Sequence, residues 1–475
     1  MNNLSFIYLF KFNFFYLCHT KIAMKIIFFF LPLFLCDRLF VFEHFRHGAR
    51  NPCDHLDEAN NDFLGIHHDV LGELTPVGVR MHYALGVRNR YRYKDFLSSS
   101  YDPREIHIVS TDVNRTVQSA ISQLNGLYPF NTGPVISGEV ISKAVPPNEL
   151  SEDVVKELNQ LGDFALPYKT QSIPIHLFHI TDHSILLQEE NGDCEYIKPF
   201  REKNMKKDVL KQNMIYFNNT YGEKIRKFLN VTKMDNPDTD YTSNFTFNNY
   251  ICDHFIADYY DGKDLTRLRD VGIDFAKLEK DCQALLALKL FEVVVSKDDP
   301  KVTQISNSAT MKRIIGWMEN RIALDKSGKR NTLAYDKPKF VMYSGHDTTV
   351  GSMEMFMNLA FKVDRLVNPT YAANLYLELH RGNDNEYYYV EYYMNDDLLM
   401  TIPYNEFKKG IEDNTLTEDE IDSICNFQYV KRQSFTIYRI IIVVLSVLIV
   451  CLALGIIILY FKKKKEAETI NSKIL

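Results

Sequence analysis

The amino-acid sequence predicts an α/β fold: a mixed sheet core flanked by helices, with a mostly helical cap insertion and one C-terminal transmembrane helix. Three short apolar segments, 39–45, 105–110 and 339–344, have the pattern of buried strands that end in polar residues. A helix-compatible segment follows the second and the third of them. Ligands of open α/β sheets bind at the carboxyl ends of the strands, so the polar residues are expected to share one crevice.

Between the first two strands, the segment 74–88 has the pattern of a helix. Thr75 is suited to cap its N-terminus, and Pro76 to begin its first turn. Four apolar residues recur at helical spacing and are expected to cover the sheet: Val77, Met81, Ala84 and Leu85.

The body of the chain divides into a core and an insertion. Residues 38–130 and 300–430 hold the strand signals and are assigned to the α/β core. Residues 131–299 hold few strand signals and several helix-like stretches, so they are expected to form a helical cap over the crevice. Late in the core, 374–380 and 387–394 are expected to form a β-hairpin.

The N-terminal segment 1–37 is interpreted as a signal region outside the fold. From Met24 onward, a lysine is followed by an apolar run of the length of a secretory signal peptide. The preceding residues are also apolar, so the true start could be Met24. An uncleaved N-terminal membrane anchor is the alternative.

An uncharged segment near the C-terminus predicts a membrane span. Residues 440–461 carry no charged side chain, and about 20 apolar residues are enough to cross a bilayer. Four lysines follow directly at 462–465, and lysine-rich flanks stay on the cytosolic side. A buried core helix is the alternative. The expectation is a single-pass type I membrane protein with a cytosolic tail at 462–475 and a lumenal (lysosome or digestive vacuole) or extracellular body.

The composition is that of a large globular protein with an acidic balance. Of its 475 residues, 46% are hydrophobic and 24% are charged, and the formal net charge at pH 7 is −6. Nucleic-acid binders usually carry a basic face, so nucleic acid is not expected as a partner. Any affinity for anions must be local and built from a few arginines.

Cysteine and asparagine usage is compatible with a secreted body. Five cysteines lie in the body, an odd number, so at least one is outside any disulfide within the chain. They are Cys53, Cys194, Cys252, Cys282 and Cys425. Glycosylation acceptor triplets begin at Asn218, Asn230 and Asn244.

The polar residues after the first and third strands point to chemistry on a phosphate ester. Arg46 and Arg50 flank His47, and arginine binds phosphate oxygens through planar, bidentate hydrogen bonds. Positive neighbours should lower the pKa of His47, which would then stay a neutral nucleophile in acid. Asp347, if protonated at low pH, could give its proton to the leaving alcohol. Gly48 would let the backbone approach closely, and its amide could help to bind an anion.

A histidine-rich stretch raises the alternative of a metal site. His67, His68 and Asp69 lie near His44 and His55 in the sequence. Their spacing follows no usual zinc pattern, and His44 alternates with the apolar residues of a strand, so packing is expected for it. No metal and no other cofactor is predicted.

The residues of these sites resemble a known family. The segment 46–52, RHGARNP, matches the RHGxRxP motif of the histidine acid phosphatases, a branch of the histidine phosphatase superfamily. The segment 344–349, SGHDTT, resembles the family's second, HD motif. Three segments between them are also similar to family segments: 72–86, 110–116 and 126–129. The likeness runs from about residue 40 to residue 427, which is nearly the whole body.

The resemblance implies a metal-independent acid phosphatase that hydrolyses small phosphate monoesters. His47 would attack phosphorus and form a phosphohistidine that water then hydrolyses, and Asp347 would be the proton donor. The residues that would bind the phosphate are Arg46, Arg50, Arg115 and His346. The arginines would supply the positive field that a metal ion supplies in other phosphatases.

The resemblance also carries a few finer expectations. It makes a disulfide between Cys194 and Cys425 plausible, and Cys252 lacks its usual partner, so that pairing with Cys282 is the candidate. Asn114 stands where the family often has an acidic residue and opens a further acceptor triplet. A glycan there would obstruct the crevice, so the triplet is expected to be unused. A homodimer is suggested by the resemblance alone.

Two alternatives remain open. The first is a narrower enzyme of the same family, a phytase or a phospholipid phosphatase. Thr349 stands where bacterial phytases of the family typically have asparagine, which favours a general phosphomonoesterase. The second is a surface protein that binds phosphorylated ligands without catalysis.

Overall fold

The computed structural model describes most of the predicted body and part of the C-terminal region. The described residues are 37–53, 62–63, 66–68, 70–177, 194–222, 224–225, 242–363, 366, 368–382, 387–425, 442–449, 452, 454–456, 458–459 and 462–463. The chain divides into two units, one of 1–188 with 203–415 and one of 189–202 with 416–475. Every predicted site residue belongs to the larger unit, and the expected signal region lies outside the described residues up to residue 36.

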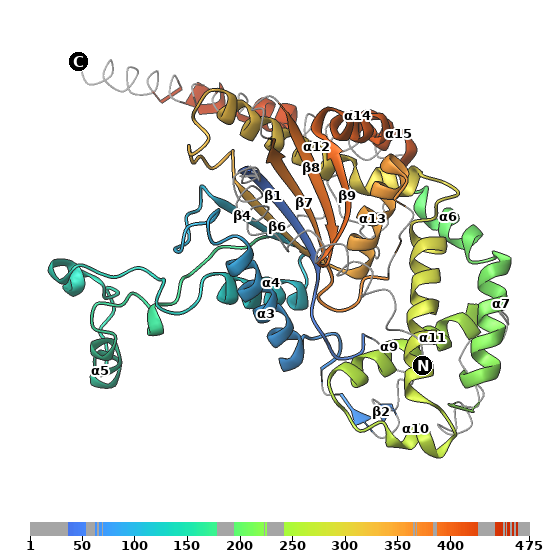
Figure 1. Cartoon of the computed structure of the whole chain (residues 1–475). Coiled ribbons are helices and arrows are strands. Elements are labelled where there is room, and N and C mark those ends of the chain that lie inside the picture. The colour runs from blue at the N-terminus through green and yellow to red at the C-terminus, as the bar shows by residue number, and fades with distance from the viewer. Residues whose placement is uncertain are drawn as a thin grey trace, which may run out of the picture. The chain divides into compact units, whose positions relative to one another are not determined.

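A seven-stranded mixed sheet forms the centre of the larger unit (Figure 1). Its strands, in spatial order, are β5 (His176–Leu177), β4 (Ile106–Ser110), β6 (Phe340–Gly345), β1 (Asp37–Arg46), β7 (Asn374–Arg381), β8 (Tyr388–Met394) and β9 (Asp397–Pro403). The first four run parallel and the last three are antiparallel. The predicted strands and the hairpin β7–β8 are thus confirmed, whereas β9 was not foreseen. A separate hairpin pairs β2 (Asp62–Phe63) with β3 (Ile66–His67).

The register of the parallel strands brings their carboxyl ends to one edge of the sheet. Arg46 at the end of β1 pairs with Gly345 at the end of β6. Ser110 at the end of β4 pairs with Ser344. The three segments that the sequence marked by polar endings therefore end side by side.

Helices cover both faces of this sheet. The labelled helices of the chain, of which only some cover the sheet, are α3 (Pro76–Arg92), α4 (Asn114–Leu127), α5 (Glu152–Gln160), α6 (Ile197–Asn204), α7 (Asp208–Phe217), α9 (Thr242–Tyr260), α10 (Thr266–Asp270), α11 (Phe275–Leu288), α12 (Lys301–Lys326), α13 (Asp347–Phe361), α14 (Tyr404–Asn414) and α15 (Glu418–Cys425). Short 3-10 segments lie at Gly138–Lys143 and Pro167–Lys169, and π-helical segments at Asn218–Gly222 and Lys289–Val294.

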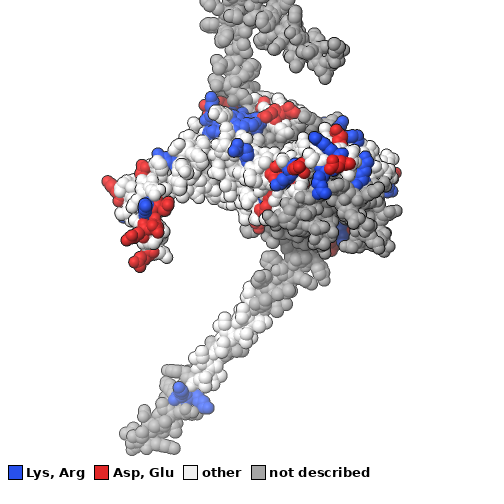
Figure 2. Space-filling model, turned by 90° about the horizontal axis from the view of Figure 1, so that it is seen from below, with Lys and Arg blue, Asp and Glu red and all other residues white. Residues whose placement is uncertain are grey.

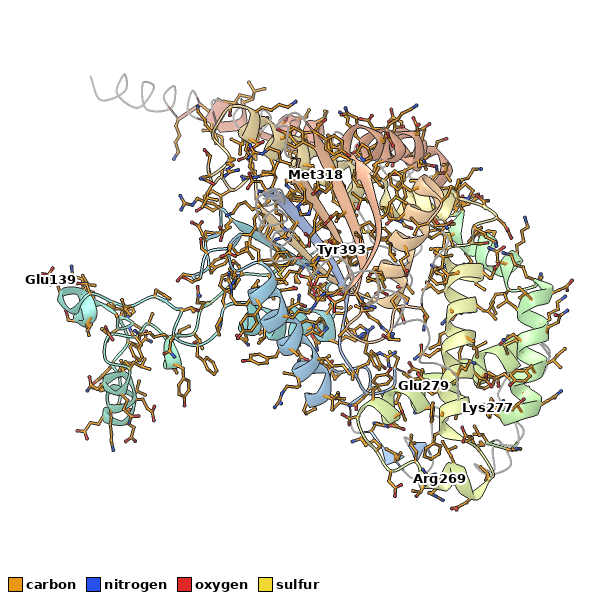
Figure 3. All side chains as sticks on the ribbon, in the orientation of Figure 1. Glu139, Arg269, Lys277, Glu279, Met318 and Tyr393 are labelled. Atoms are coloured by element: carbon orange, nitrogen blue, oxygen red, sulfur yellow. A yellow bond between two sulfur atoms is a disulfide. The ribbon has the colours of Figure 1, made fainter. Side chains whose placement is uncertain are left out.

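Strand β1 shows how the two faces are filled. Its side chains alternate between the faces, as in any strand. Phe40 and Phe42 belong to the apolar cluster that α12, α13 and α14 share with the sheet. Met318 of α12, labelled in Figure 3, belongs to the same cluster. Val41 and Phe45 belong to the cluster on the other face, with residues of α4.

Helix α3 has the predicted cap but buries a different face from the predicted one. The Thr75 side chain accepts a hydrogen bond from the Gly78 amide at 3.3 Å. Ala84, on the predicted apolar face, is exposed. The residues that α3 buries are Gly78, His82, Gly86 and Asn89. This face meets α4 by close backbone contact and by polar side chains, neither of which an apolar periodicity can reveal.

Downstream helices form a second apolar cluster. It joins α7, α9 and α11 with parts of the segment that precedes β7. A disulfide between Cys252 of α9 and Cys282 of α11 ties two of these helices together. The segment with α5 stands apart from them in Figure 1. The boundaries of the expected cap, 131–299, remain a prediction.

The second disulfide, Cys194–Cys425, lies within the smaller unit. Both expected pairings are therefore present, and Cys53 belongs to neither of them.

The predicted C-terminal span is wrong. Among the described residues, no helix combines the length and the apolar character that crossing a bilayer requires. The expected type I topology and the expected attachment to a membrane rested on that span.

Lysine, arginine, aspartate and glutamate side chains are interspersed on the described part of the face in Figure 2.

Prediction on the α3–α4 contact. A Cβ atom on Gly86 would lie 1.9 Å from the backbone oxygen of Gln123. We expect Gly86→Ala to lower the free energy of unfolding by about 1–3 kcal/mol, as overpacking does, measured by urea denaturation. Gly316 of α12 is the matched control because a Cβ there meets no atom within 4 Å. Gly316→Ala should leave stability unchanged or raise it by up to about 1 kcal/mol. Equal effects of the two substitutions would contradict this packing.

Candidate active site

His47 lies directly after β1, at the carboxyl edge of the sheet. Its amide donates to the Gly345 carbonyl at 2.9 Å, and its side chain is buried. The ring Nδ1 lies 2.8 Å from the carbonyl oxygen of Gly48. Because a carbonyl oxygen can only accept, Nδ1 must carry the hydrogen. The lone pair of the neutral ring is then on Nε2, where it can act as a nucleophile.

The surroundings of His47 favour this neutral form. Its pKa is lowered well below the usual range, first by burial and then by the positive charges of Arg46, Arg115 and Arg50. The sequence predicted the effect of the arginines. It did not predict that removal from water would be the larger cause.

Gly48 has a different role from the expected one. Its amide donates to Ser119 Oγ at 3.1 Å, so it is already occupied within the protein. A Cβ atom on Gly48 would lie 2.5 Å from the Gly78 backbone oxygen. Glycine at this position therefore allows α3 to pack against the segment after β1, and the amide is not free to bind an anion.

Arg46 and Arg50 are each held by a carboxylate. Arg46 donates to the Pro369 carbonyl at 2.7 Å and forms an ion pair with Asp347 at 2.9 Å. Arg50 donates to both carboxylate oxygens of Asp253, at 2.6 and 3.3 Å. These contacts fix the direction of each guanidinium group before any ligand binds.

Arg115, in the first turn of α4, differs from the other two arginines. Within the part of the chain that the structure describes, no carboxylate pairs with it, and its buried Nε has no hydrogen-bond partner. Burial lowers its pKa, and the charge of Arg50 adds to this effect. Its charge is the least compensated of the three, so an anion would interact with it most directly.

Two further residues of the site were missed by sequence reasoning. Asp253 of α9 accepts from Arg50 and also from the Cys53 amide at 2.8 Å. Burial would raise the pKa of Asp253, but the Arg50 charge outweighs burial and lowers it to about 2. Tyr371 lies with its ring 4.5 Å from the Arg46 guanidinium and 5.9 Å from the His47 ring. Neither residue stands in a motif, and only folding brings them to the site.

His346 and Asp347 begin α13, directly after β6. The His346 ring lies 5.6 Å from that of His47, and its Nε2 lies 3.0 Å from Thr111 Oγ1. Burial lowers the pKa of His346 to about 3, with Arg115 adding to the effect. All six residues that the sequence selected thus come together at one edge of the sheet.

The ionisation of Asp347 differs from the expected one. Burial raises its pKa, but the positive charge of Arg46 outweighs burial and lowers it. Without ligand, Asp347 is therefore a carboxylate in mildly acidic solution and not a carboxylic acid. The proton that the expected mechanism needs must arrive with the substrate or after it binds.

His44 is packed, as expected. It lies within β1 and is fully buried, with Nε2 3.0 Å from Thr349 Oγ1. Burial lowers its pKa to about 3.

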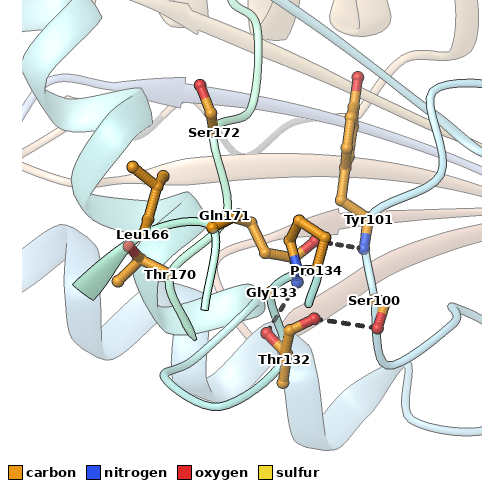
Figure 4. A pocket seen from close by; sticks show the side chains of 10 residues that line it. Ser100, Tyr101, Thr132, Gly133, Pro134, Leu166, Thr170, Gln171 and Ser172 are labelled. Carbon is orange, nitrogen blue, oxygen red and sulfur yellow. Dashed lines mark hydrogen bonds between the residues drawn. The ribbon is translucent and has the colours of Figure 1, made fainter. Parts of the chain in front are cut away.

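A cavity of about 520 Å³ lies elsewhere (Figure 4). It is lined by Ser100, Tyr101, Thr132, Gly133, Pro134, Ala165, Leu166, Thr170, Gln171 and Ser172. None of these residues is charged, and the Tyr101 amide and the Gln171 side chain already hydrogen bond within the lining. This cavity offers no positive charge to a phosphate group, so it is not the candidate active site.

A mixed sheet whose carboxyl edge gathers three guanidinium groups around a neutral imidazole is typical of an α/β enzyme that acts on phosphate groups. Comparison with known proteins agrees with this class. The family model described as "Histidine phosphatase superfamily (branch 2)" matches residues 41–395, and the chain belongs to that family.

Several relatives are named acid phosphatases. Prostatic acid phosphatase of Bos taurus is 24% identical over 358 residues, which cover 74% of this chain and 76% of the relative. Lysosomal acid phosphatase of Xenopus laevis is 36% identical over 108 residues, or 23% of this chain and 25% of the relative. Among solved structures, the phytase from Citrobacter braakii matches with a TM-score of 0.54 and 14% identity, covering 80% of this chain and 98% of the phytase. At that identity, the last match indicates a shared fold only.

Prediction on the Asp253–Arg50 pair. A folded-state pKa near 2, below the ordinary 3.8, means that the pair stabilises the protein above about pH 4. This contribution is lost as the pH falls towards 2. We expect Asp253→Asn to lower the free energy of unfolding by roughly 2 kcal/mol at pH 7 and by less at pH 3.

The same substitution should raise KM for a phosphate ester by about tenfold. Without Asp253 the Arg50 guanidinium is no longer oriented, and the loss of one charge-assisted hydrogen bond to phosphate weakens binding by at least that factor. Asp270→Asn is the control, because Asp270 is exposed and lies after α9 in the same region. A stability difference that does not change between pH 7 and pH 3, or an unchanged KM, would contradict the role of the pair.

Proposed function

We propose that this acid phosphatase hydrolyses phosphate monoesters through a covalent phosphohistidine on His47, without a metal ion. The observation that carries the proposal is the His47 ring, which is neutral, has Nδ1 hydrogen bonded to Gly48, and leaves Nε2 unprotonated among three guanidinium groups. A nucleophile that stays neutral in acid is what an acid phosphatase needs.

The proposed reaction has two steps. First, Nε2 of His47 attacks phosphorus, the bond from phosphorus to the ester oxygen breaks, and the leaving oxygen takes a proton from Asp347. Second, a water molecule gives its proton to Asp347 and attacks phosphorus, which releases phosphate and restores the neutral imidazole. Arg46, Arg50 and Arg115 would stabilise the charge on the phosphoryl oxygens, and His346 would hydrogen bond to one of them.

The ion pair between Arg46 and Asp347 suggests how Asp347, the proton donor, acquires its proton. A phosphate group bound to Arg46 would share the guanidinium charge that keeps the pKa of Asp347 low. The negative charge of the phosphate would raise that pKa further. Asp347 would then accept the proton of a singly protonated substrate and pass it to the leaving group.

The compartment and assembly belong to the same proposal. The two disulfides suit an oxidising environment, and relatives carry the names lysosomal and prostatic acid phosphatase. We therefore infer a lumenal or extracellular location. Within the proposal, residues 131–299 act as the insertion that sets substrate preference, and the protein is a homodimer, which analytical ultracentrifugation would test.

The narrower alternative, a phytase, gains no specific support. The phytase from Citrobacter braakii shares the fold at 14% identity, and fold alone does not fix a substrate. Turnover of inositol hexakisphosphate beside that of an aryl phosphate would separate the two enzymes.

Prediction on the nucleophile. We expect His47→Ala to lower kcat by at least about 10³-fold and to abolish a phosphoenzyme that is stable in alkali and labile in acid. The measurement is rapid quenching with a ³²P-labelled substrate. The control is His107→Ala, a residue of β4 outside the site, which should retain both activity and phosphoenzyme. Activity should survive a chelator, and undiminished turnover of His47→Ala would refute the mechanism.

Prediction on the proton donor. We expect Asp347→Asn to slow hydrolysis of an alkyl phosphate by about 10²–10⁴-fold, the usual range for general acid catalysis. It should slow p-nitrophenyl phosphate much less, since nitrophenolate leaves without a proton. Comparing kcat/KM for the two substrates measures this difference. Equal losses on both substrates would instead assign Asp347 to binding.

A further inference from the structure

Three buried side chains of the kinds that bind metals meet away from His47. His68 follows the short strand β3, whereas His254 and Asp258 belong to α9. His254 and Asp258 lie one helical turn apart and so project from the same side of α9. The exposed fractions of the three residues are 3%, 3% and 0%. Figure 1 shows the β2–β3 hairpin beside α9 and α10.

The geometry of the cluster is close to that of a metal site. One ligand atom from each residue lies within 4.8 Å of the other two. His68 Nε2 is 3.0 Å from Asp258 Oδ1, and the two imidazole rings are 6.2 Å apart. Ligand atoms around tetrahedral zinc, with bonds of about 2.0–2.1 Å, are roughly 3.4 Å apart. A small side-chain movement would therefore be enough to enclose an ion.

The carboxylate of Asp258 points to a missing partner. Both of its oxygens are buried, and neither accepts a hydrogen bond from any residue that the structure describes. The contact with His68 is short, but the imidazole and the carboxylate are not in hydrogen-bond geometry. A buried carboxylate without donors costs several kcal/mol. A divalent cation between the carboxylate and the two imidazoles would remove that cost.

A second cluster of similar composition gives a useful contrast. Glu378, His380 and Glu391 also lie within 4.8 Å of one another. Glu378, however, already pairs with Arg38 and Arg92, each at 2.7 Å. Two guanidinium groups occupy its oxygens and would repel a cation. Within the part of the chain that the structure describes, no arginine or lysine forms an ion pair with Asp258, whose ion-pair partner there is His68.

We propose that His68, His254 and Asp258 bind one zinc ion, with water as the fourth ligand. Two imidazoles and one carboxylate form a ligand set that binds zinc in preference to calcium or magnesium. The ion would fasten the β3 segment to α9. Asp253, the partner of Arg50, is the neighbour of His254 in that helix, so the ion would steady the segment that orients Arg50. It takes no part in the chemistry at phosphorus.

The sequence does not reveal this site because His68 lies far from His254 and Asp258 along the chain. The sequence grouped His67, His68 and Asp69 by their adjacency, and of this group His68 belongs to the cluster. The pair His254–Asp258 has the spacing of two ligands on one helix face, but it becomes recognisable only when the third ligand is known.

The first experiment measures zinc content. The full-length chain is purified at pH 7.5 and equilibrated with Zn²⁺. Unbound metal is removed by gel filtration, and the zinc content is measured by inductively coupled plasma mass spectrometry. We expect about one zinc ion per wild-type chain and at least a tenfold lower content in Asp258→Asn and His254→Ala. His176→Ala, which removes an exposed histidine of β5, should retain the wild-type content. Equal zinc content in wild type and Asp258→Asn would overturn the proposal.

A second measurement does not depend on the folding of a variant. If zinc binds the native state alone, the Tm of the wild type must rise with Zn²⁺ concentration at pH 7.5 and fall when a chelator is added. A Tm that does not respond to Zn²⁺ at pH 7.5 would refute the site. Because the readouts are metal content and Tm, the result is independent of the phosphatase mechanism.

Discussion

The structure depends on one electrostatic constraint: three guanidinium groups must be held near one another around an imidazole that has been removed from water. Like charges repel, and the repulsion grows as water is excluded. Arg46 and Arg50 tolerate this arrangement because Asp347 and Asp253 each balance one charge. Tyr371 adds the negative face of its ring beneath Arg46.

The fold can be understood as the means of meeting this constraint. The parallel strands β1, β4 and β6 end in register, so the residues that follow them all begin at the carboxyl edge of the sheet. The pair Gly48–Gly78 lets α3 approach that edge, and Ser119 of α4 occupies the Gly48 amide. The counter-charge for Arg50 comes from α9, which belongs to the separate apolar cluster. The Arg50–Asp253 ion pair is therefore one of the contacts that couple the core to the downstream helices.

The sequence predicted the strands and all six residues at the carboxyl edge, because both depend on local patterns. Apolar runs with polar endings mark strand ends, and short motifs carry residues such as His47 and His346. Asp253 and Tyr371 could not be predicted, since they stand in no motif and act only through three-dimensional contacts. The ionisation of Asp347 was predicted wrongly because its proton affinity depends on the contact with Arg46.

Two structural predictions failed for other reasons. The buried face of α3 is made of glycine and polar residues such as His82, so an apolar periodicity selected the wrong side. The C-terminal span was predicted from an uncharged segment of sufficient length followed by lysines, whereas among the described residues no helix is long and apolar enough to cross a membrane.

The burial of neutral histidines has a thermodynamic consequence for the whole molecule. Burial lowers the pKa of His44, His82 and His346 to about 3–4, and that of His47 falls as well. In the unfolded chain these rings take up protons as the pH falls below about 6.5. Between about pH 6.5 and the lowered folded-state pKa values, the unfolded state then binds more protons than the native state, so a fall in pH shifts the equilibrium towards unfolding. The burial that keeps the nucleophile neutral thus also makes acid a denaturant. Loss of the fold, and not protonation of His47, should set the lowest pH at which the enzyme works.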